Sequence, residues 1–348
     1  MKKSSTFAFG SFLSAAVLLT GCAAGVPDGG DDSGAGGSSS TLQLAHVFPE
    51  ASAVHSGAVS IQEQAPEVTD GRVSFELFPG AQLGGDEELG AGLASGDVDC
   101  AFFASTASGL DPRLQLSLLP FIVTDYDQAD AVFFNPDGAL QTSERDVLAE
   151  LGITAFGFYE NDFRGLTNSS HPIESPEDLE GLSLRVPGLP MYVDLFTAWD
   201  AQPTAIPFPE LYAALQQGTV DGQDNGIVLS ANSRFDEVQD YLTLTRHAYG
   251  MGTLACNTDV WESLSDEDRD ALQGLADEVT VDVTQEVRGS VAENLASLEE
   301  NGMEVTELSA SQIAEFAEVK DEIWDGQADV FGADVIADLR AEVESLSE

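Results

Sequence analysis

The residue whose type and position most clearly indicate a chemical role is an arginine at the end of a short apolar segment. Residues 180–188 read EGLSLRVPG, in which three apolar residues alternate with Ser183 and Arg185, the period of a half-buried β-strand. The chain has 13 Lys and Arg residues against 61 Asp and Glu residues, so positively charged side chains are scarce. A guanidinium presents a planar pair of N–H donors that matches a carboxylate. The segment leaves two interpretations open: Arg185 binds a carboxylate ligand, or it pairs with one of the acidic side chains of the chain.

The formal net charge of −48 restricts the classes of partner. Nucleic acids are excluded because their phosphates require clustered Lys and Arg, and a basic lipid-binding patch is excluded for the same reason. An anionic small molecule is not excluded. The Debye length is about 8 Å at physiological ionic strength, which screens distant carboxylates. A guanidinium 4 Å from a carboxylate contributes on the order of 4 kcal/mol at an effective dielectric constant of 20.

Sequence motifs of common enzymes are absent from the chain. We find no G-x-S-x-G, H-E-x-x-H, Walker or G-x-G-x-x-G motif, and the four histidines do not have the spacing of metal ligands. Carboxylate pairs are expected everywhere in a chain with 61 acids, so they do not indicate catalysis. The sequence predicts no catalytic residue, metal site or cofactor, and a hydrolase that uses paired carboxylates is the alternative class.

The N-terminal residues have the pattern of an exported lipoprotein. Two lysines precede an apolar stretch over residues 7–19, which is too short to span a bilayer comfortably. The following LTGC resembles the lipobox of bacterial lipoproteins, in which the cysteine is acylated. We predict a signal peptide over residues 1–22 with lipidated Cys22, and a flexible Gly/Ser/Asp linker over residues 23–40. The alternative is an ordinary cleaved signal with a chance cysteine.

The other two cysteines, Cys100 and Cys256, lie in the apolar segments VDCAFF and TLAC. Their surroundings predict two buried free thiols. A disulfide between them is the alternative, because an exported protein meets an oxidising environment.

Strand and helix patterns alternate from Thr41 onward, which predicts an α/β architecture with largely parallel sheets. The C-terminal third is expected to be mostly helical, with a long helix to Glu300 that could pack across two lobes. The predicted strands are TLQLAHVF, RVSFELF, VDCAFF, ITAFGFY and LSLRV, and the earlier helices cover residues 52–68, 86–95, 190–199 and about 209–217.

Two long segments give this pattern a family resemblance. FRGLTNSSHPIESPEDLEGLSLRVPG and AQPTAIPFPELYAALQQGTVDGQDN, with GRVSFELFPGAQLGGDEELGAGLASGDVD in the N-terminal half, resemble the DctP-type solute-binding proteins of tripartite ATP-independent (TRAP) transporters. The resemblance covers about residues 41–300. It implies an extracytoplasmic protein, in the periplasm or lipid-anchored at the outer face of the cell membrane.

The family fold that this resemblance implies is bilobed and periplasmic-binding-protein-like (type II-like). It has two mixed-sheet lobes, crossing hinge segments and a long C-terminal helix. We expect one lobe from residues 41–161 and 250–290, and the other from residues 162–249 and 291–348. The expected function is to bind an organic acid, such as a C4-dicarboxylate, keto acid or sugar acid, and deliver it to an ion-gradient-driven membrane permease. The alternative is a receptor for another transporter or a sensor.

The resemblance also implies the residues that contact the ligand. In the family, the arginine at the position of Arg185 forms a bidentate salt bridge to the ligand carboxylate, and Arg164 lies beside it. Asn225 comes from the segment QDNG, where the family commonly has Q-E-N-P, and Phe208 is the aromatic residue before the next helix. The alternatives are that Glu160 or Asp162 neutralises Arg164, that Asn225 is a turn residue and that Phe208 packs in the core.

Three further residues are expected near the ligand. His55 and Gln82 point toward the cleft in the family arrangement, and Ser105 follows the VDCAFF strand, where its hydroxyl could contact the ligand. Each could instead be a surface or turn residue.

Overall fold

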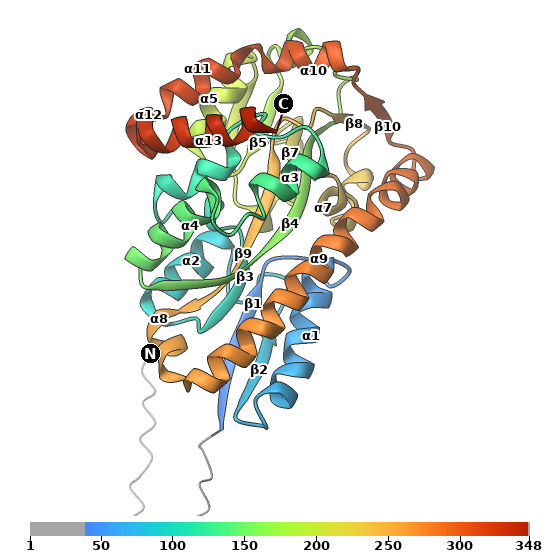
Figure 1. Ribbon diagram of the computed structural model, residues 1–348. Helices are drawn as coiled ribbons and strands as arrows, with labels where there is room; N and C mark the ends of the chain where they lie inside the picture. The colour runs from blue at the N-terminus through green and yellow to red at the C-terminus, as the bar shows by residue number, and fades with distance from the viewer. Residues whose placement is uncertain (1–38, 347–348) are drawn as a thin grey trace, which may run out of the picture. The chain divides into compact units, whose positions relative to one another are not determined.

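A computed structural model describes residues 39–346 of the chain (Figure 1). The predicted signal peptide, Cys22 and nearly all of the predicted linker lie outside the described residues. Within residues 39–346, no helix combines the length and apolar character needed to cross a membrane.

The first group of strands has the order β2-β1-β3-β9-β4. β1 pairs in parallel with β2 and β3, whereas β9 runs antiparallel between β3 and β4. The sheet is therefore mixed, as the family resemblance implies, rather than largely parallel. The bounds are β1 Ser40–His46, β2 Val73–Phe78, β3 Cys100–Phe103, β4 Ile153–Asn168 and β9 Tyr249–Asn257.

The second group continues from the other end of β4, which therefore belongs to both groups. Residues 153–163 of β4 pair with β9, and residues 164–168 pair with β7 and β8. β5 lies between β7 and β6 and is parallel to both, and β10 pairs with β8. The bounds are β5 Ser183–Val186, β6 Gln202–Ala205, β7 Gly222–Gly226, β8 Tyr241–Leu244 and β10 Glu304–Glu307.

The helices begin and end at the residues that favour such ends. The hydroxyl of Ser52 accepts a hydrogen bond from the first turn of α1 and that of Ser265 from the first turn of α9, and Gly96 ends α2 in the left-handed region. The bounds are α1 Ala53–Val68, α2 Asp86–Ser95, α3 Tyr126–Val132, α4 Ala139–Glu150, α5 Pro190–Ala198, α6 Phe208–Gln216, α7 Ile227–Asn232, α8 Thr258–Ser263, α9 Asp266–Glu300, α10 Ala310–Phe316, α11 Lys320–Gly326, α12 Ala328–Phe331 and α13 Ala333–Ser345.

The long helix α9 contacts both groups of strands. Val279 and Val283, in its first half, belong to the hydrophobic core around the first group, while Leu298 near its end packs with Leu242 of β8. Figure 1 shows α9 running beside α1 and continuing toward β10. The described residues belong to one compact unit, so the lobe boundaries stay a prediction.

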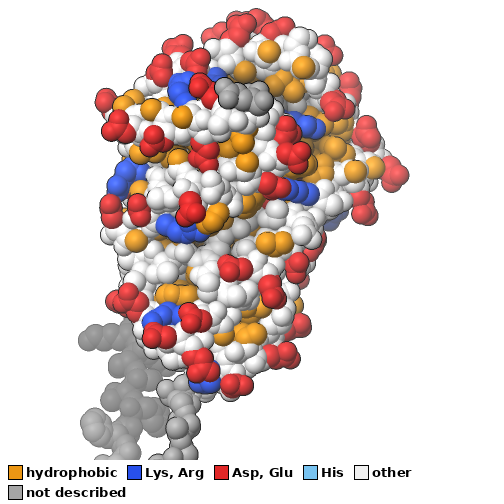
Figure 2. Space-filling view, in the orientation of Figure 1, with side chains coloured by type: hydrophobic (Ala, Val, Ile, Leu, Met, Phe, Trp, Pro, Cys, Tyr) orange, Lys and Arg blue, Asp and Glu red, His pale blue; other side chains and the backbone are white. Residues whose placement is uncertain are grey.

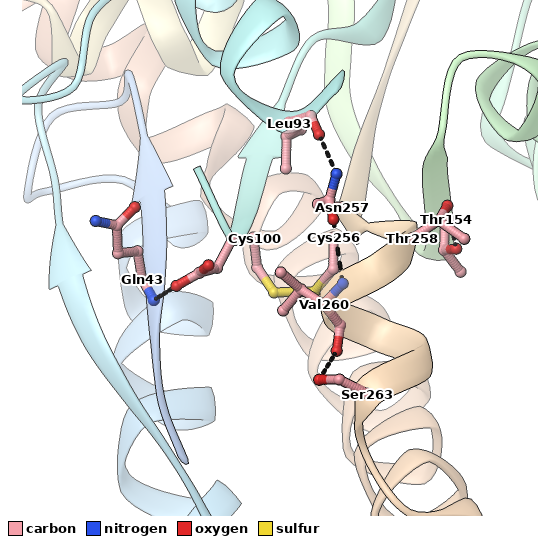
Figure 3. The surroundings of a disulfide bond; sticks show 10 residues. Gln43, Leu93, Cys100, Thr154, Cys256, Asn257, Thr258, Val260 and Ser263 are labelled. Carbon is pink, nitrogen blue, oxygen red and sulfur yellow. Dashed lines mark hydrogen bonds between the residues drawn. A yellow bond between two sulfur atoms is a disulfide. The ribbon is translucent and has the colours of Figure 1, made fainter. Parts of the chain in front are cut away.

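A disulfide joins Cys100 of β3 to Cys256 of β9 (Figure 3). The prediction of two free thiols is therefore wrong. The two cysteines are buried and lie directly opposite each other in the antiparallel β3–β9 pair. Next to the bridge, Asn257 donates to the Leu93 carbonyl and accepts from the Val260 amide, which fixes the start of α8. The two cysteines are 156 positions apart in the chain, so the local sequence pattern does not reveal their pairing.

Removal of this disulfide is expected to lower the free energy of unfolding by about 2–5 kcal/mol, because the bridge closes a long loop in the unfolded chain. The double variant Cys100→Ala/Cys256→Ala tests this in urea unfolding at fixed salt. A reductant should destabilise the wild type under unfolding conditions and leave the variant unchanged. Equal unfolding midpoints for the oxidised wild type and the variant would contradict this expectation.

Candidate functional site

Arg185 is a buried cation at the end of β5. The residue is 3% exposed, and its Nε donates to the Ile206 carbonyl at 2.7 Å. Among residues 39–346, no carboxylate lies within 4.0 Å of its guanidinium nitrogens. Burial and the neighbouring positive charge of Arg164 lower the pKa of Arg185 to about 9, so it is still charged at neutral pH. Its two terminal nitrogens are therefore donors without an anionic partner in the described part of the chain.

Arg164, in contrast, has its own counterion. Its Nε lies 2.9 Å and its Nη2 2.7 Å from the two carboxylate oxygens of Asp224. His247 Nε2 lies 2.9 Å from Asp224 Oδ1. Burial raises the pKa of Asp224, but Arg164 and His247 outweigh this and hold it well below its usual range. Asp224, rather than Glu160 or Asp162, is thus the residue that neutralises Arg164.

Neighbouring strands bring these residues together. In the pairing of β4 with β7, Arg164 is opposite Gly226, and in the pairing of β5 with β7, Arg185 is opposite Gln223. A Cβ atom on Gly226 would lie 2.6 Å from the Asn161 carbonyl oxygen. Glycine at position 226 therefore allows β7 to approach this part of β4 closely.

A cavity lies where the two groups of strands meet at β4. It contains about 540 Å³ of empty space, part of it open to solvent. Four of the predicted residues line it: Arg185, Arg164, Asn225 and Phe208. Phe208 also packs against hydrophobic clusters on both sides. The remaining lining residues are Val47, Phe48, Asp86, Ala104, Thr106, Ala107, Leu118, Asn161, Pro187, Leu189, Leu229, Gly250 and Met251.

The other three predicted residues do not line this cavity. The Ser105 hydroxyl donates to Glu144 at 2.5 Å, inside a buried network, and is not directed to the cavity. His55 Nδ1 lies 3.1 Å from His46 Nε2, and burial together with His55 lowers the pKa of His46 to about 4. Gln82 is exposed on the loop after β2. The structure therefore places these three residues outside the cavity lining, and their contact with a ligand stays a prediction.

Three polar cavity residues, Asp86, Thr106 and Asn161, were not predicted from the sequence. Asp86 is the first residue of α2, and its Oδ1 accepts from the Ala104 amide at 2.8 Å. Burial raises the pKa of Asp86 to about 6, although the Ala104 amide and the charge of Arg185 oppose this shift. Asn161 lies in β4, where the pairing with β9 is irregular between Glu160 and Phe163. In the sequence, Asp86 marks only a helix start, and no local signal relates it to Arg185.

The chemistry of the cavity is that of a binding site. Its charged groups are the paired Arg164, the unpaired Arg185 and Asp86, and its other polar side chains are neutral. In the part of the chain that the structure describes, no group of three or more His, Cys, Asp or Glu is arranged to hold a metal ion. The cavity lies at β4, the strand that both groups share, and it contains a buried cation. In an α/β fold, this arrangement defines a binding protein for a small anionic molecule.

The comparisons with known proteins agree with this class. The family model described as bacterial extracellular solute-binding protein, family 7 (DctP) matches residues 44–329. The chain belongs to this family of TRAP transporter solute-binding proteins, which confirms the resemblance seen in its sequence.

Three similar proteins illustrate the relationship. A solute-binding protein of Roseobacter denitrificans is 31% identical over 310 residues, which cover 88% of this chain and 90% of that protein. A crystal structure of this Roseobacter protein with bound L-galactonate has a TM-score of 0.77 and 30% identity, covering 88% and 98% of the two chains. A TRAP periplasmic solute-binding protein from a Polaromonas species, bound to D-erythronate, has a TM-score of 0.80 and 30% identity, covering 86% and 98%.

Proposed function

We propose that this chain binds a small organic acid in the cavity at β4 and delivers it to the membrane permease of a TRAP transporter. The observation that carries the proposal is Arg185, a buried guanidinium without a carboxylate partner among the described residues. An unpaired buried charge is costly, and a ligand carboxylate would supply the missing counterion through two parallel hydrogen bonds. Arg164 and Asn225 would border the bound acid, and Phe208 would cover it.

The bound ligands of similar proteins support a carboxylate. The Roseobacter and Polaromonas structures hold L-galactonate and D-erythronate, and both molecules are sugar acids with one carboxylate. In this chain, closure of the lobes around the acid would create the surface that the permease recognises. The lobes would comprise residues 41–161 with 250–290 and residues 162–249 with 291–348.

The proposal includes the location of the protein. Acylated Cys22 would hold it at the outer face of the cell membrane, and residues 23–40 would act as the tether. Figure 2 shows acidic side chains spread over the visible face, which suits a domain that must stay dispersed outside the cell. Among the described residues that line the cavity there is no Ser, Cys, His or Lys, and the proposed role is binding without turnover.

A thermal-shift screen of the purified protein against organic acids tests the proposal. The set should contain C4-dicarboxylates, keto acids and sugar acids, with uncharged sugars as controls. An acid at a hundredfold excess over its Kd is expected to stabilise the protein by about 2.7 kcal/mol. Stabilisation by uncharged sugars alone, or turnover of a bound acid, would contradict the proposed function.

A further inference from the structure

We propose that the site selects acids with a single carboxylate and several hydroxyl groups, and that Asp86 is the residue that rejects a second carboxylate. This inference rests on the proposed function and assigns the substrate class of the same site. The residues that carry it are the unpaired Arg185, the carboxylate Asp86 and three neutral polar residues that line the cavity.

The cavity has one cation for the ligand. Arg164 also lines it, but Asp224 already accepts three hydrogen bonds from its Nε and Nη2. A ligand carboxylate at Arg164 would therefore compete with a bound counterion, whereas one at Arg185 would not. A dicarboxylate could place one end at Arg185, but its other end would find no unpaired cation among the lining residues.

Asp86 makes the remaining space unfavourable for a second negative charge. It lines the cavity together with Arg185, and the charges of the two side chains interact. The Ala104 amide occupies Oδ1, while Oδ2 has no hydrogen-bond partner among the described residues. A carboxylate oxygen accepts hydrogen bonds but cannot donate them. Asp86 would therefore accept a ligand hydroxyl and repel a ligand carboxylate.

A hollow that adjoins the cavity adds two further acidic residues. It has about 310 Å³ of empty space and is lined by Asp86, Arg185 and Phe208 together with Glu87 and Glu88. Glu87 is exposed there. A dicarboxylate that extended outward from Arg185 would thus meet further negative charge.

The neutral polar side chains are suited to hydroxyl groups. Thr106, Asn161 and Asn225 line the cavity. Within residues 39–346, the Thr106 hydroxyl, the Asn161 side-chain amide and the Asn225 Nδ2 make no hydrogen bond, while Asn225 Oδ1 accepts only from the adjacent Gly226 amide. Such groups can donate to and accept from alcohols. A polyhydroxy acid would occupy them, whereas an unsubstituted acid would leave them unpaired.

Two sets of acids with equal chain length test the inference by calorimetry at pH 7.5. The four-carbon set is D-erythronate, succinate and butyrate, and the six-carbon set is L-galactonate and adipate. In at least one set, the polyhydroxy acid is expected to bind about tenfold or more tightly than the dicarboxylate. A difference of about tenfold in Kd corresponds to the free energy of one hydrogen bond to a charged group. Asp86→Asn should lower this ratio by about tenfold, mainly by improving dicarboxylate binding.

The control is Asp270→Asn, which removes the same charge from an exposed position on α9 and should leave the ratio unchanged. Dicarboxylates that bind as tightly as the polyhydroxy acids in both sets would overturn the inference. A folded Asp86→Asn variant with the same ratio of polyhydroxy-acid affinity to dicarboxylate affinity as the wild type would also overturn it. Either result leaves the proposed function standing, because an acid still binds. Absence of binding by every acid, including those of the wider screen, would overturn both.

Discussion

Replacement of Arg185 by lysine is expected to raise the Kd for the bound acid by about 10- to 100-fold, and replacement by alanine by more. The lysine keeps the charge but loses the planar fork and one charge-assisted hydrogen bond, which contributes about 1.5–3 kcal/mol. It also loses the bond from Nε to the Ile206 carbonyl that orients the guanidinium. Calorimetry with the acid that stabilises the wild type most measures the effect.

A matched control for this variant is Arg234→Lys. The Arg234 side chain is 73% exposed and pairs with Glu237 on the surface, so the same substitution there should leave acid affinity unchanged. Thermal unfolding of both variants shows whether they are folded. An Arg185→Lys protein that is folded and binds the acid within twofold of wild type would contradict the role given to Arg185.

Removal of the Asp224 carboxylate is expected to destabilise the protein by about 3–5 kcal/mol, because it leaves Arg164 buried without its counterion. Asp224 is 0% and Arg164 6% exposed, so solvent cannot replace the lost partner. Asp224→Ala and Asp224→Asn should both show the loss in chemical unfolding monitored by tryptophan fluorescence. His247, which lies 2.9 Å from Asp224, would lose the same partner.

A double variant separates the buried charge from other effects. Arg164→Leu/Asp224→Leu removes both charges and should recover most of the lost stability, as buried ion pairs replaced by apolar residues often do. Asp270→Asn controls for the change in net charge. An Asp224 variant within 1 kcal/mol of wild type, or a double variant no more stable than the single one, would show that this ion pair does not control the local stability.

Helices with strong end signals could be located from the sequence. The α2 bounds Asp86–Ser95 equal the predicted ones, because acidic residues favour its start and Gly96 adopts a φ of 81° at its end. The helix α9 begins after Ser265, whose hydroxyl accepts a hydrogen bond from the Asp268 amide, and its first turn is also acidic. Such signals are local, so neighbouring residues are sufficient to find them.

Features that depend on distant partners were not predictable in this way. The strand predicted over residues 153–159 continues to Asn168 as β4, because its polar residues are buried against β7 and α9 rather than exposed. The disulfide and the position of Asp86 beside Arg185 also join segments far apart in the chain. The family motif led to Arg185, Arg164, Asn225 and Phe208, which line the cavity. Such a motif carries tertiary information, whereas periodicity does not.

A crystal structure of the protein with its tightest-binding acid tests most directly whether an unpaired guanidinium holds the ligand. We expect the ligand carboxylate within about 3 Å of both terminal nitrogens of Arg185, in the cavity lined by Asn225 and Phe208, with Asp224 still bonded to Arg164. A ligand bound elsewhere, with Arg185 facing solvent or paired to a protein carboxylate, would contradict this account.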